Sequence, residues 1–205
     1  MHSTETALIK GYNDIALAID KGQPIILVLL DLSAPFDTDD HDILLSRLSS
    51  RFGICGKALK WFESYLSDRK QHVNINGSSS CSSKLSQGVP QGSALGPILY
   101  SLYTSPLADI ANAHGLNINS YADDTQIYIT FNSSCANIIH SISKIEACIQ
   151  DIKNLMILNK LKMNNSKTDF IVMSSSYRPR PLINALAVYL FYLFIQLSLS
   201  TEQLI

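Results

Sequence analysis

The chain has 205 residues, which suits one domain with a short appendage and is long enough to bury a hydrophobic core. Its 16 basic and 17 acidic residues almost cancel, and this balance argues against tight independent binding of nucleic acid, which depends on neutralising phosphates. The cysteines form no CxxC pair and have no histidine at metal-ligand spacing, which argues against a zinc site and suits a reducing compartment, cytoplasmic or nuclear. They are Cys55, Cys81, Cys135 and Cys148.

The first third of the chain predicts helices around one buried strand. Ser3–Lys21 has the amphipathic pattern of a helix. Ile25–Leu32 (IILVLLDL) is a continuous aliphatic run, typical of a strand buried on both faces, although a buried helix segment has the same pattern. His41–Arg51 and Lys57–Ser67 predict two further helices. Asp31 ends the aliphatic run, where its charge requires a partner such as a metal ion because desolvation is costly.

Three acidic residues crowd the start of the helix predicted at residues 41–51. Asp39, Asp40 and Asp42 stand where negative charge is favoured by the helix dipole. We prefer this structural interpretation to a role as a third metal-binding acid.

Basic residues and one tryptophan occur near the third predicted helix and near the carboxyl end of the chain. We interpret Trp61 as a packing anchor rather than a platform for base stacking. We interpret the basic groups as solvated helix or loop faces rather than a binding stripe. These groups are Lys57 with Lys60, Arg69 with Lys70, and Lys160 with Lys162 and Lys167.

The middle of the chain predicts a hairpin, a glycine-rich loop and a helix. Gln71–Asn76 and Cys81–Ser86 predict two strands around a turn at residues 77–80. Gln87–Pro97 (QGVPQGSALGP) either cradles a phosphate or a nucleic-acid strand, or simply leads into the next helix. Pro97–Ala113 predicts that helix, which Pro106 kinks or splits.

The sequence Tyr121-Ala122-Asp123-Asp124 lies between two short β-prone runs, Leu116–Ser120 and Gln126–Phe131. This pattern predicts a β-hairpin with acids at its tip, although acidic turns are common for reasons of local hydrogen bonding. Carboxylates on separate strands suit a pair of Mg²⁺ ions in phosphoryl transfer. Beyond the hairpin, Cys135–Leu161 predicts one long helix or two shorter ones, and Thr168–Met173 predicts a closing strand.

Three blocks in this order resemble the reverse transcriptase of non-LTR (LINE-type) retrotransposons. They are LLDLSAPFDTDDHDILL (residues 29–45), SQGVPQGSALGPILYSLYT (residues 86–104) and YADD (residues 121–124). A weaker fourth block spans residues 159–164 and 167–170, and the resemblance covers roughly residues 2–173. It implies an α+β fold with a polymerase palm-like antiparallel sheet, which we expect helices to cover on one face, with partial fingers and no thumb. We expect this domain at residues 1–176 and a hydrophobic tail at residues 177–205.

The resemblance also implies a reaction and its cofactor. The reaction is template-directed attack of a DNA primer 3′-hydroxyl on a dNTP, with RNA as the template. Asp31 and Asp123 would hold two Mg²⁺ ions, with Mn²⁺ as an alternative metal, and Asp124 would stand beside them as a further metal-binding and catalytic acid.

Four other residues take their expected roles from the resemblance alone. Phe36 falls where the family keeps an aromatic residue that blocks a ribose 2′-hydroxyl. Gln91 and Gly92 would lie near the incoming nucleotide and the template base. Lys167 matches a lysine that assists departure of pyrophosphate, so it is expected to be catalytic.

Several features depart from the family pattern and leave other functions open. Pro35, Asp39 and Leu155 replace residue types that are usual there. Most of the fingers and the thumb are expected to belong to a longer element. Residues 182–199 form an apolar run of about 27 Å as a helix, close to a hydrocarbon core of about 30 Å, and are either a membrane segment or a non-homologous tail. The alternatives are therefore a catalytically inactive retrotransposon-derived fragment and a small membrane-tethered protein.

Overall fold

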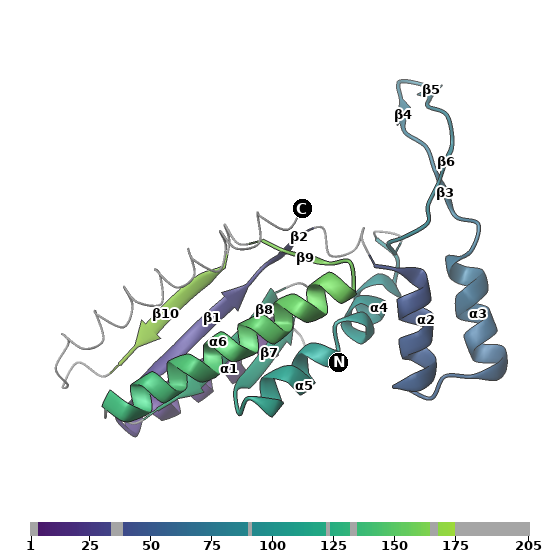
Figure 1. Ribbon diagram of the computed structural model, residues 1–205. Coiled ribbons are helices and arrows are strands. Elements are labelled where there is room, and N and C mark those ends of the chain that lie inside the picture. Colours follow the sequence, from purple (N-terminus) through teal and green to yellow (C-terminus); the bar gives the residue numbers. More distant parts are fainter. Residues whose placement is uncertain are drawn as a thin grey trace. The chain divides into compact units, whose positions relative to one another are not determined.

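The computed structural model describes residues 4–33, 39–89, 92–121, 124–131, 135–164 and 168–174, and they form two compact units (Figure 1). The first unit takes its described residues from Met1–Leu32, Leu107–Asn154 and Met163–Ile205. The second takes them from Ser33–Pro106 and Leu155–Lys162. The expected boundary between residues 176 and 177 lies outside the described residues and stays a prediction.

A four-stranded antiparallel sheet forms the centre of the first unit. Its strand order is β10-β1-β8-β7, with β1 at Ile25–Leu30, β7 at Asn117–Tyr121, β8 at Asp124–Thr130 and β10 at Asp169–Met173. The aliphatic run is therefore a strand and not a helix segment. Four of its six residues, Ile25, Ile26, Val28 and Leu30, are at most 3% exposed, so the prediction of burial on both faces is confirmed.

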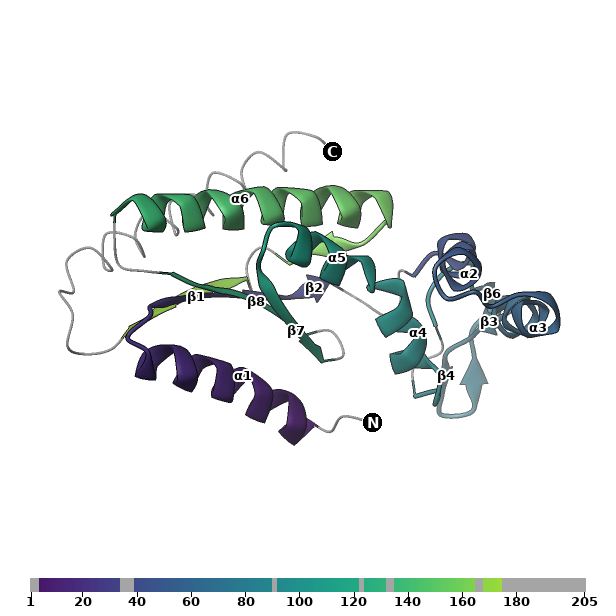
Figure 2. The same ribbon diagram turned by 90° about the horizontal axis from the view of Figure 1, so that it is seen from below.

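Helices cover both faces of this sheet. Figure 2 shows α1 (Thr4–Asp20) on one side and α6 (Cys135–Leu158) with α5 (Pro106–Ala113) on the other. Ala18 of α1 packs with Ile25 and Leu27, which alternate along β1 with side chains of the opposite face. The expectation that helices cover one face was wrong, because β1 is apolar at almost every position and needs cover on both sides.

The second unit contains α2 (His41–Ser50), α3 (Gly56–Leu66) and α4 (Gly96–Tyr103). The helix predicted at residues 97–113 is split, because α5 begins at Pro106, whose ring cannot continue the hydrogen-bond ladder of α4. A separate two-stranded sheet pairs β2 (Leu32–Ser33) with β9 (Lys162–Met163).

A narrow arm follows α3 in the second unit (Figure 1). The two strands predicted there are four strands of two residues each: β3 (Lys70–Gln71), β4 (Asn74–Ile75), β5 (Ser78–Ser79) and β6 (Ser83–Lys84). β3 pairs with β6, and β4 pairs with β5. The turn is at Asn76-Gly77, where both residues have positive φ (50° and 82°), the geometry of a two-residue hairpin loop, and not at residues 77–80 as predicted.

The acids at the start of α2 have different environments. Asp40 caps the helix by accepting hydrogen bonds from the backbone N–H groups of Asp42 (3.0 Å) and Ile43 (3.1 Å). The hydrogen bond from Lys160 is the main reason why the pKa of Asp40 lies below its usual value. Asp39 is fully buried, and neither carboxylate oxygen has a hydrogen-bond partner among the described residues. The helix-dipole interpretation thus suits Asp40 and Asp42, but it was wrong for Asp39.

Trp61 is 53% exposed on α3, so its interpretation as a packing anchor was wrong. The helix packs instead through Leu66, which is 2% exposed, and the half-buried Leu59 and Phe62. These buried positions recur at helical spacing, and Trp61 stands beside them rather than among them.

The apolar run at residues 182–199 lies outside the described residues. Among the helices that the structure describes, none combines the length and the apolar character that crossing a membrane requires.

Candidate active site

The pairing of β1 and β8 brings two of the predicted metal ligands to the same place. The strands are antiparallel, and Leu30 lies opposite Thr125. Asp31 directly follows Leu30, and Asp124 directly precedes Thr125, so the two aspartates adjoin the last pair of this register at the same end of β1 and β8.

The β7–β8 hairpin carries Asp124 at its tip, as the sequence predicts for this segment. Its strands pair from Asn117↔Tyr128 to Tyr121↔Asp124. Thr125 is 4% exposed, and its hydroxyl donates to Ser120 Oγ at 3.3 Å. The paired ends and the buried threonine hold the exposed carboxylate of Asp124 on regular strand backbone rather than on a long loop.

Asp31 is half-buried and is held from the segment after β9. The backbone N–H of Asn164 donates to the Asp31 carbonyl oxygen at 2.9 Å. Asn164 Nδ2 donates to Asp31 Oδ2 at 3.0 Å. The Asn164 carbonyl in turn accepts from the Thr168 hydroxyl at 3.0 Å. The sequence pointed to Asn164 only through its place in the weak fourth block. No periodicity could link it to Asp31, which lies 133 positions earlier.

The donor chemistry of this site fits a hard divalent cation. Asp31 and Asp124 supply carboxylate oxygens, which Mg²⁺ and Mn²⁺ accept. Within the described ranges, no group of three or more histidine, cysteine, aspartate or glutamate side chains is placed to hold a metal. Asp123, the other predicted ligand of the hairpin, lies outside those ranges, so the set of three acids stays a prediction.

The glycine-rich loop is anchored to the segment that opens α2. Gln87 forms a β-bridge with Asp40, and the N–H of Gly88 donates to the Asp39 carbonyl at 2.8 Å. His41 Nε2 lies 2.8 Å from the Gly88 carbonyl oxygen, to which it donates as an N–H group. Gly88 has φ +82°, a conformation that strongly favours glycine. Sequence reasoning did not identify His41, since one histidine at a helix start carries no specific signal.

Gly92 opens the part of this loop that leads into α4. It is exposed and has φ +77°, and no heavy atom of the described structure lies within 4 Å of the position that a Cβ would occupy. Conformation rather than lack of space therefore requires glycine there. Ser93 Oγ then accepts from the N–H of Gly96 at 3.0 Å and so satisfies a donor at the start of α4. The other predicted nucleotide and catalytic residues, Phe36, Gln91 and Lys167, lie outside the described residues.

A buried polar network holds the second unit together. Tyr103 donates its hydroxyl hydrogen to the Asn159 carbonyl at 2.6 Å and accepts from the N–H of Asp40 at 3.3 Å. Arg47 donates to the Tyr103 carbonyl and, at 2.6 Å, to Asn159 Oδ1. Burial raises the pKa of the Tyr103 hydroxyl and lowers that of the Arg47 guanidinium. These bonds tie the start of α2 to the end of α4 and to residues 155–162.

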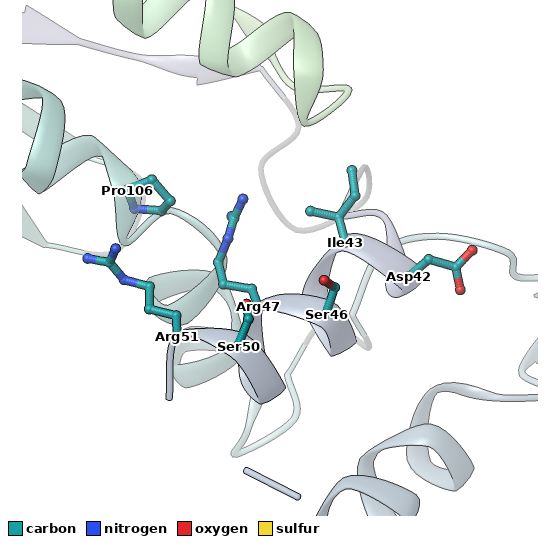
Figure 3. Close-up of a pocket in the computed structure, with 7 residues that line it drawn as sticks. All are labelled: Asp42, Ile43, Ser46, Arg47, Ser50, Arg51 and Pro106. Atoms are coloured by element: carbon teal, nitrogen blue, oxygen red, sulfur yellow. The ribbon is translucent and has the colours of Figure 1, made fainter. Parts of the chain in front are cut away.

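The open hollow in Figure 3 is not this candidate site. It has a volume of about 530 Å³ and is lined mainly by α2, with Pro106 at one side. Figure 3 shows Arg47 and Arg51 extending from α2 on the Pro106 side, with Asp42 at the far end. Both arginines donate to backbone carbonyls, Arg47 to Tyr103 and Arg51 to Ser105 at 3.5 Å. Their positive charges therefore lie at the carboxyl end of α4, where the helix dipole favours them. None of the predicted site residues lines the hollow.

The sequence is similar to those of proteins whose family is known. Residues 1–188 match the model of the family described as reverse transcriptase (RNA-dependent DNA polymerase). A probable RNA-directed DNA polymerase from transposon BS of Drosophila melanogaster is 33% identical over 141 residues, which cover 66% of this chain and 15% of that protein. The RNA-directed DNA polymerase from mobile element jockey of Drosophila funebris is 26% identical over 185 residues, covering 88% of this chain and 20% of that protein.

Solved telomerase structures share the fold. Apo telomerase from Candida tropicalis, truncated from its C-terminal domain, superposes with a TM-score of 0.62 at 16% identity and covers 87% of this chain and 37% of that one. Telomerase from Candida albicans, in complex with the TWJ fragment of telomeric RNA, gives 0.61 at 13% identity, with 88% and 32% covered. The expected polymerase palm-like α+β fold is therefore confirmed. The chain spans about a seventh to a fifth of the curated relatives that it matches. By its sequence and by its fold, this chain belongs to the reverse transcriptase (RNA-dependent DNA polymerase) family.

Proposed function

We propose that this chain carries the RNA-directed DNA polymerase chemistry of its family: nucleotidyl transfer from a dNTP to the 3′-hydroxyl of a primer on an RNA template. The register of β1 with β8 carries the proposal, because it sets Asp31 and Asp124 at the same end of neighbouring strands. Two carboxylates held at the same end of adjacent, rigid strands are what a shared cation site requires.

Asp31, Asp123 and Asp124 would hold two Mg²⁺ ions, or Mn²⁺ in their place. Asp123 directly precedes Asp124 in the sequence, and its part in the site rests on the family resemblance. Bound there, the metal pair supplies Lewis-acid stabilisation of the attacking and leaving oxygens in the transfer.

Asn164 has a positioning role in this proposal. Its side-chain amide holds Oδ2 of Asp31, and its backbone N–H holds the carbonyl of the same residue. A carboxylate restrained by such bonds loses less rotational freedom when it binds a cation. The contact thus orients Asp31 before substrate arrives.

The remaining roles come from family resemblance. Phe36 would exclude a ribose 2′-hydroxyl, Gln91 and Gly92 would contact the nucleotide and the template, and Lys167 would assist departure of pyrophosphate. The open space at the Cβ position of Gly92 supports its part, because a ligand approaches such a backbone closely.

Primer extension on an RNA template with Mg²⁺ or Mn²⁺ tests the proposal. We expect the 205-residue chain to extend a DNA primer, and Asp31→Asn or Asp124→Asn to lower the rate at least about a hundredfold, as loss of an essential charge at a reacting centre does. Asp20→Asn, which neutralises an exposed acid of α1, is the matched control and should extend at the wild-type rate. Equal extension by wild type and Asp31→Asn would refute the assignment of the acids, and no extension by the wild-type chain would refute the activity.

A further inference from the structure

α3 carries cationic and aromatic side chains at a regular helical spacing. Lys57, Trp61, Tyr65 and Arg69 follow one another at intervals of four residues. The first three therefore share one face of α3, and Arg69 follows just beyond its last turn. We call these four residues the α3 stripe. All four belong to the second unit, and none is among the predicted catalytic residues.

The middle of the α3 stripe is an ordered stack of rings. Trp61 and Tyr65 are nearly parallel, with an interplanar angle of 14° and ring centroids 5.5 Å apart. The guanidinium carbon of Arg69 lies 4.8 Å from the Tyr65 ring centroid, and its Nε donates to the Tyr65 carbonyl at 2.7 Å. Phe62 packs edge-on against Trp61 from the buried side, with the two ring centroids 5.1 Å apart. A large aromatic side chain is thus held in place while 53% of its surface stays exposed.

Positive charge surrounds this stack. Lys57, Lys60 and Lys70 are exposed, as is Arg69, and no ion pair forms at any of the four in the described part of the chain. The pairing of β3 with β6 sets Lys70 directly opposite Lys84, which adds to the positive charge on this side of the second unit.

The neighbouring acids belong to another surface. Glu63 stands two positions after Trp61, about 200° further around the helix. Glu63 and Asp68 line a hollow of about 350 Å³ together with Asp42 of α2 and Lys84. None of the four residues of the α3 stripe lines this hollow.

We propose that the α3 stripe binds single-stranded nucleic acid, with a base stacked on Trp61 and the backbone phosphates paired with Lys57, Arg69 and Lys70. Proteins that bind single strands without sequence preference combine exposed aromatic rings with a cationic track in this way. An exposed aromatic ring bordered by cations at both ends suits a stacked polyanion better than it suits an apolar protein partner. RNA is taken as the probe because of the proposed function, but the stripe uses none of the acids on which that function depends.

The chain contains a single tryptophan, so fluorescence excited selectively in tryptophan, and not in its nine tyrosines, reports on this surface. We expect titration of the 205-residue chain with oligouridylate to quench that fluorescence saturably, and added salt to weaken the binding steeply. Double-stranded RNA of the same length should quench less, because its bases are already stacked. Absence of quenching, or equal quenching by heparin, which is a polyanion without bases, would overturn the proposal.

Variants locate the binding, measured by the anisotropy of labelled oligouridylate. Trp61→Ala, Tyr65→Ala and Lys57→Gln should each weaken affinity by about tenfold. Trp61 and Lys57 are exposed and Tyr65 is half-buried, so circular dichroism must show that each variant keeps the wild-type fold. Tyr12→Ala and Lys10→Gln remove an exposed aromatic and an exposed cation of α1 and should have no effect. Asp31→Asn should also bind normally, which separates this proposal from failure of the polymerase activity. Unchanged affinity in Trp61→Ala and Tyr65→Ala would refute the stacking surface and point to a protein partner.

Discussion

The side-chain amide of Asn164 donates a 3.0 Å hydrogen bond to the carboxylate of Asp31, although 133 residues separate the two in the sequence. The backbone of Asn164 holds the carbonyl of the same aspartate at 2.9 Å. The acid that ends the central strand is thus positioned by the segment after β9 as well as by its own strand. This relationship makes Asn164 the first residue to test beside the predicted acids.

Asn164→Ala should lower the affinity for the metal clearly while lowering the free energy of unfolding only slightly. Removing a partner that orients a metal ligand lowers affinity by about tenfold, whereas losing one partly exposed hydrogen bond costs about 1 kcal/mol of unfolding free energy. Calorimetric titration with Mn²⁺ and unfolding by urea give the two quantities. Asn117→Ala, at an exposed position of β7, is the control for amide loss. An unchanged Mn²⁺ affinity in Asn164→Ala would show that the hydrogen bond has no positioning role.

Asp39 should make the fold less stable as the pH rises. Burial raises the pKa of its carboxyl from 3.8 to about 7, even though the positive charge of Arg47 acts in the opposite direction. Between these two values the folded chain keeps a proton that the unfolded chain releases, so the contribution of Asp39 is fully present below pH 3.8 and is lost as the pH rises through about 7. The loss amounts to about 4 kcal/mol.

Asp39→Val isolates this effect, because an apolar side chain of similar size needs no proton and no partner. We expect urea unfolding to show the variant more stable than wild type at pH 8, with a difference that shrinks toward pH 4. Asp20→Asn, at an exposed acid, should follow the wild-type pH profile. A variant that is less stable than wild type at pH 8 would mean that the carboxylate has a stabilising partner.

Tyr103→Phe should destabilise the second unit. Its hydroxyl donates to the Asn159 carbonyl and accepts from the Asp40 N–H. In the variant, each of these two backbone groups loses that hydrogen-bond partner. The expected cost is about 2 kcal/mol of unfolding free energy, measured with urea. Tyr12→Phe, at a site 75% exposed, should change it by no more than about 0.5 kcal/mol. Equal stabilities of the two variants would contradict the network.

His41→Ala should loosen the glycine-rich loop. His41 Nε2 lies 2.8 Å from the Gly88 carbonyl, and the N–H of Gly88 donates to Asp39. Without the histidine, we expect faster hydrogen exchange at the Gly88 amide, because local opening costs less free energy. His72→Ala, in the exposed arm, serves as the control and should leave that exchange rate unchanged. Wild-type protection of Gly88 in His41→Ala would show that the backbone contacts suffice.

Local signals in the sequence were enough to predict most of the elements. The aliphatic run at residues 25–30 could only be a buried strand or a buried helix segment, and Pro106 marked where two helices separate. The long helix predicted from residue 135 is a single helix, Cys135–Leu158. These features depend on neighbouring residues, which the sequence displays directly.

Features that depend on distant contacts could not be predicted in the same way. The burial of Asp39 and the exposure of Trp61 depend on which side of each segment meets the rest of the second unit. The carboxylate of Asp31 finds Asn164 only when β9 has been placed. The hairpin tip was predicted from YADD, but its place at the same end as Asp31 comes from the pairing of β1 with β8.

Calorimetric titration with Mn²⁺, applied to wild type, Asp31→Asn, Asp124→Asn and the double variant, tests the shared cation site most directly. If the two carboxylates hold the same ions, each single variant should lose most of the affinity, and the double variant should lose little more than either one. The three variants must keep the wild-type circular dichroism spectrum for the comparison to hold. Independent and additive losses, or Mn²⁺ binding that persists unchanged in the double variant, would contradict the account.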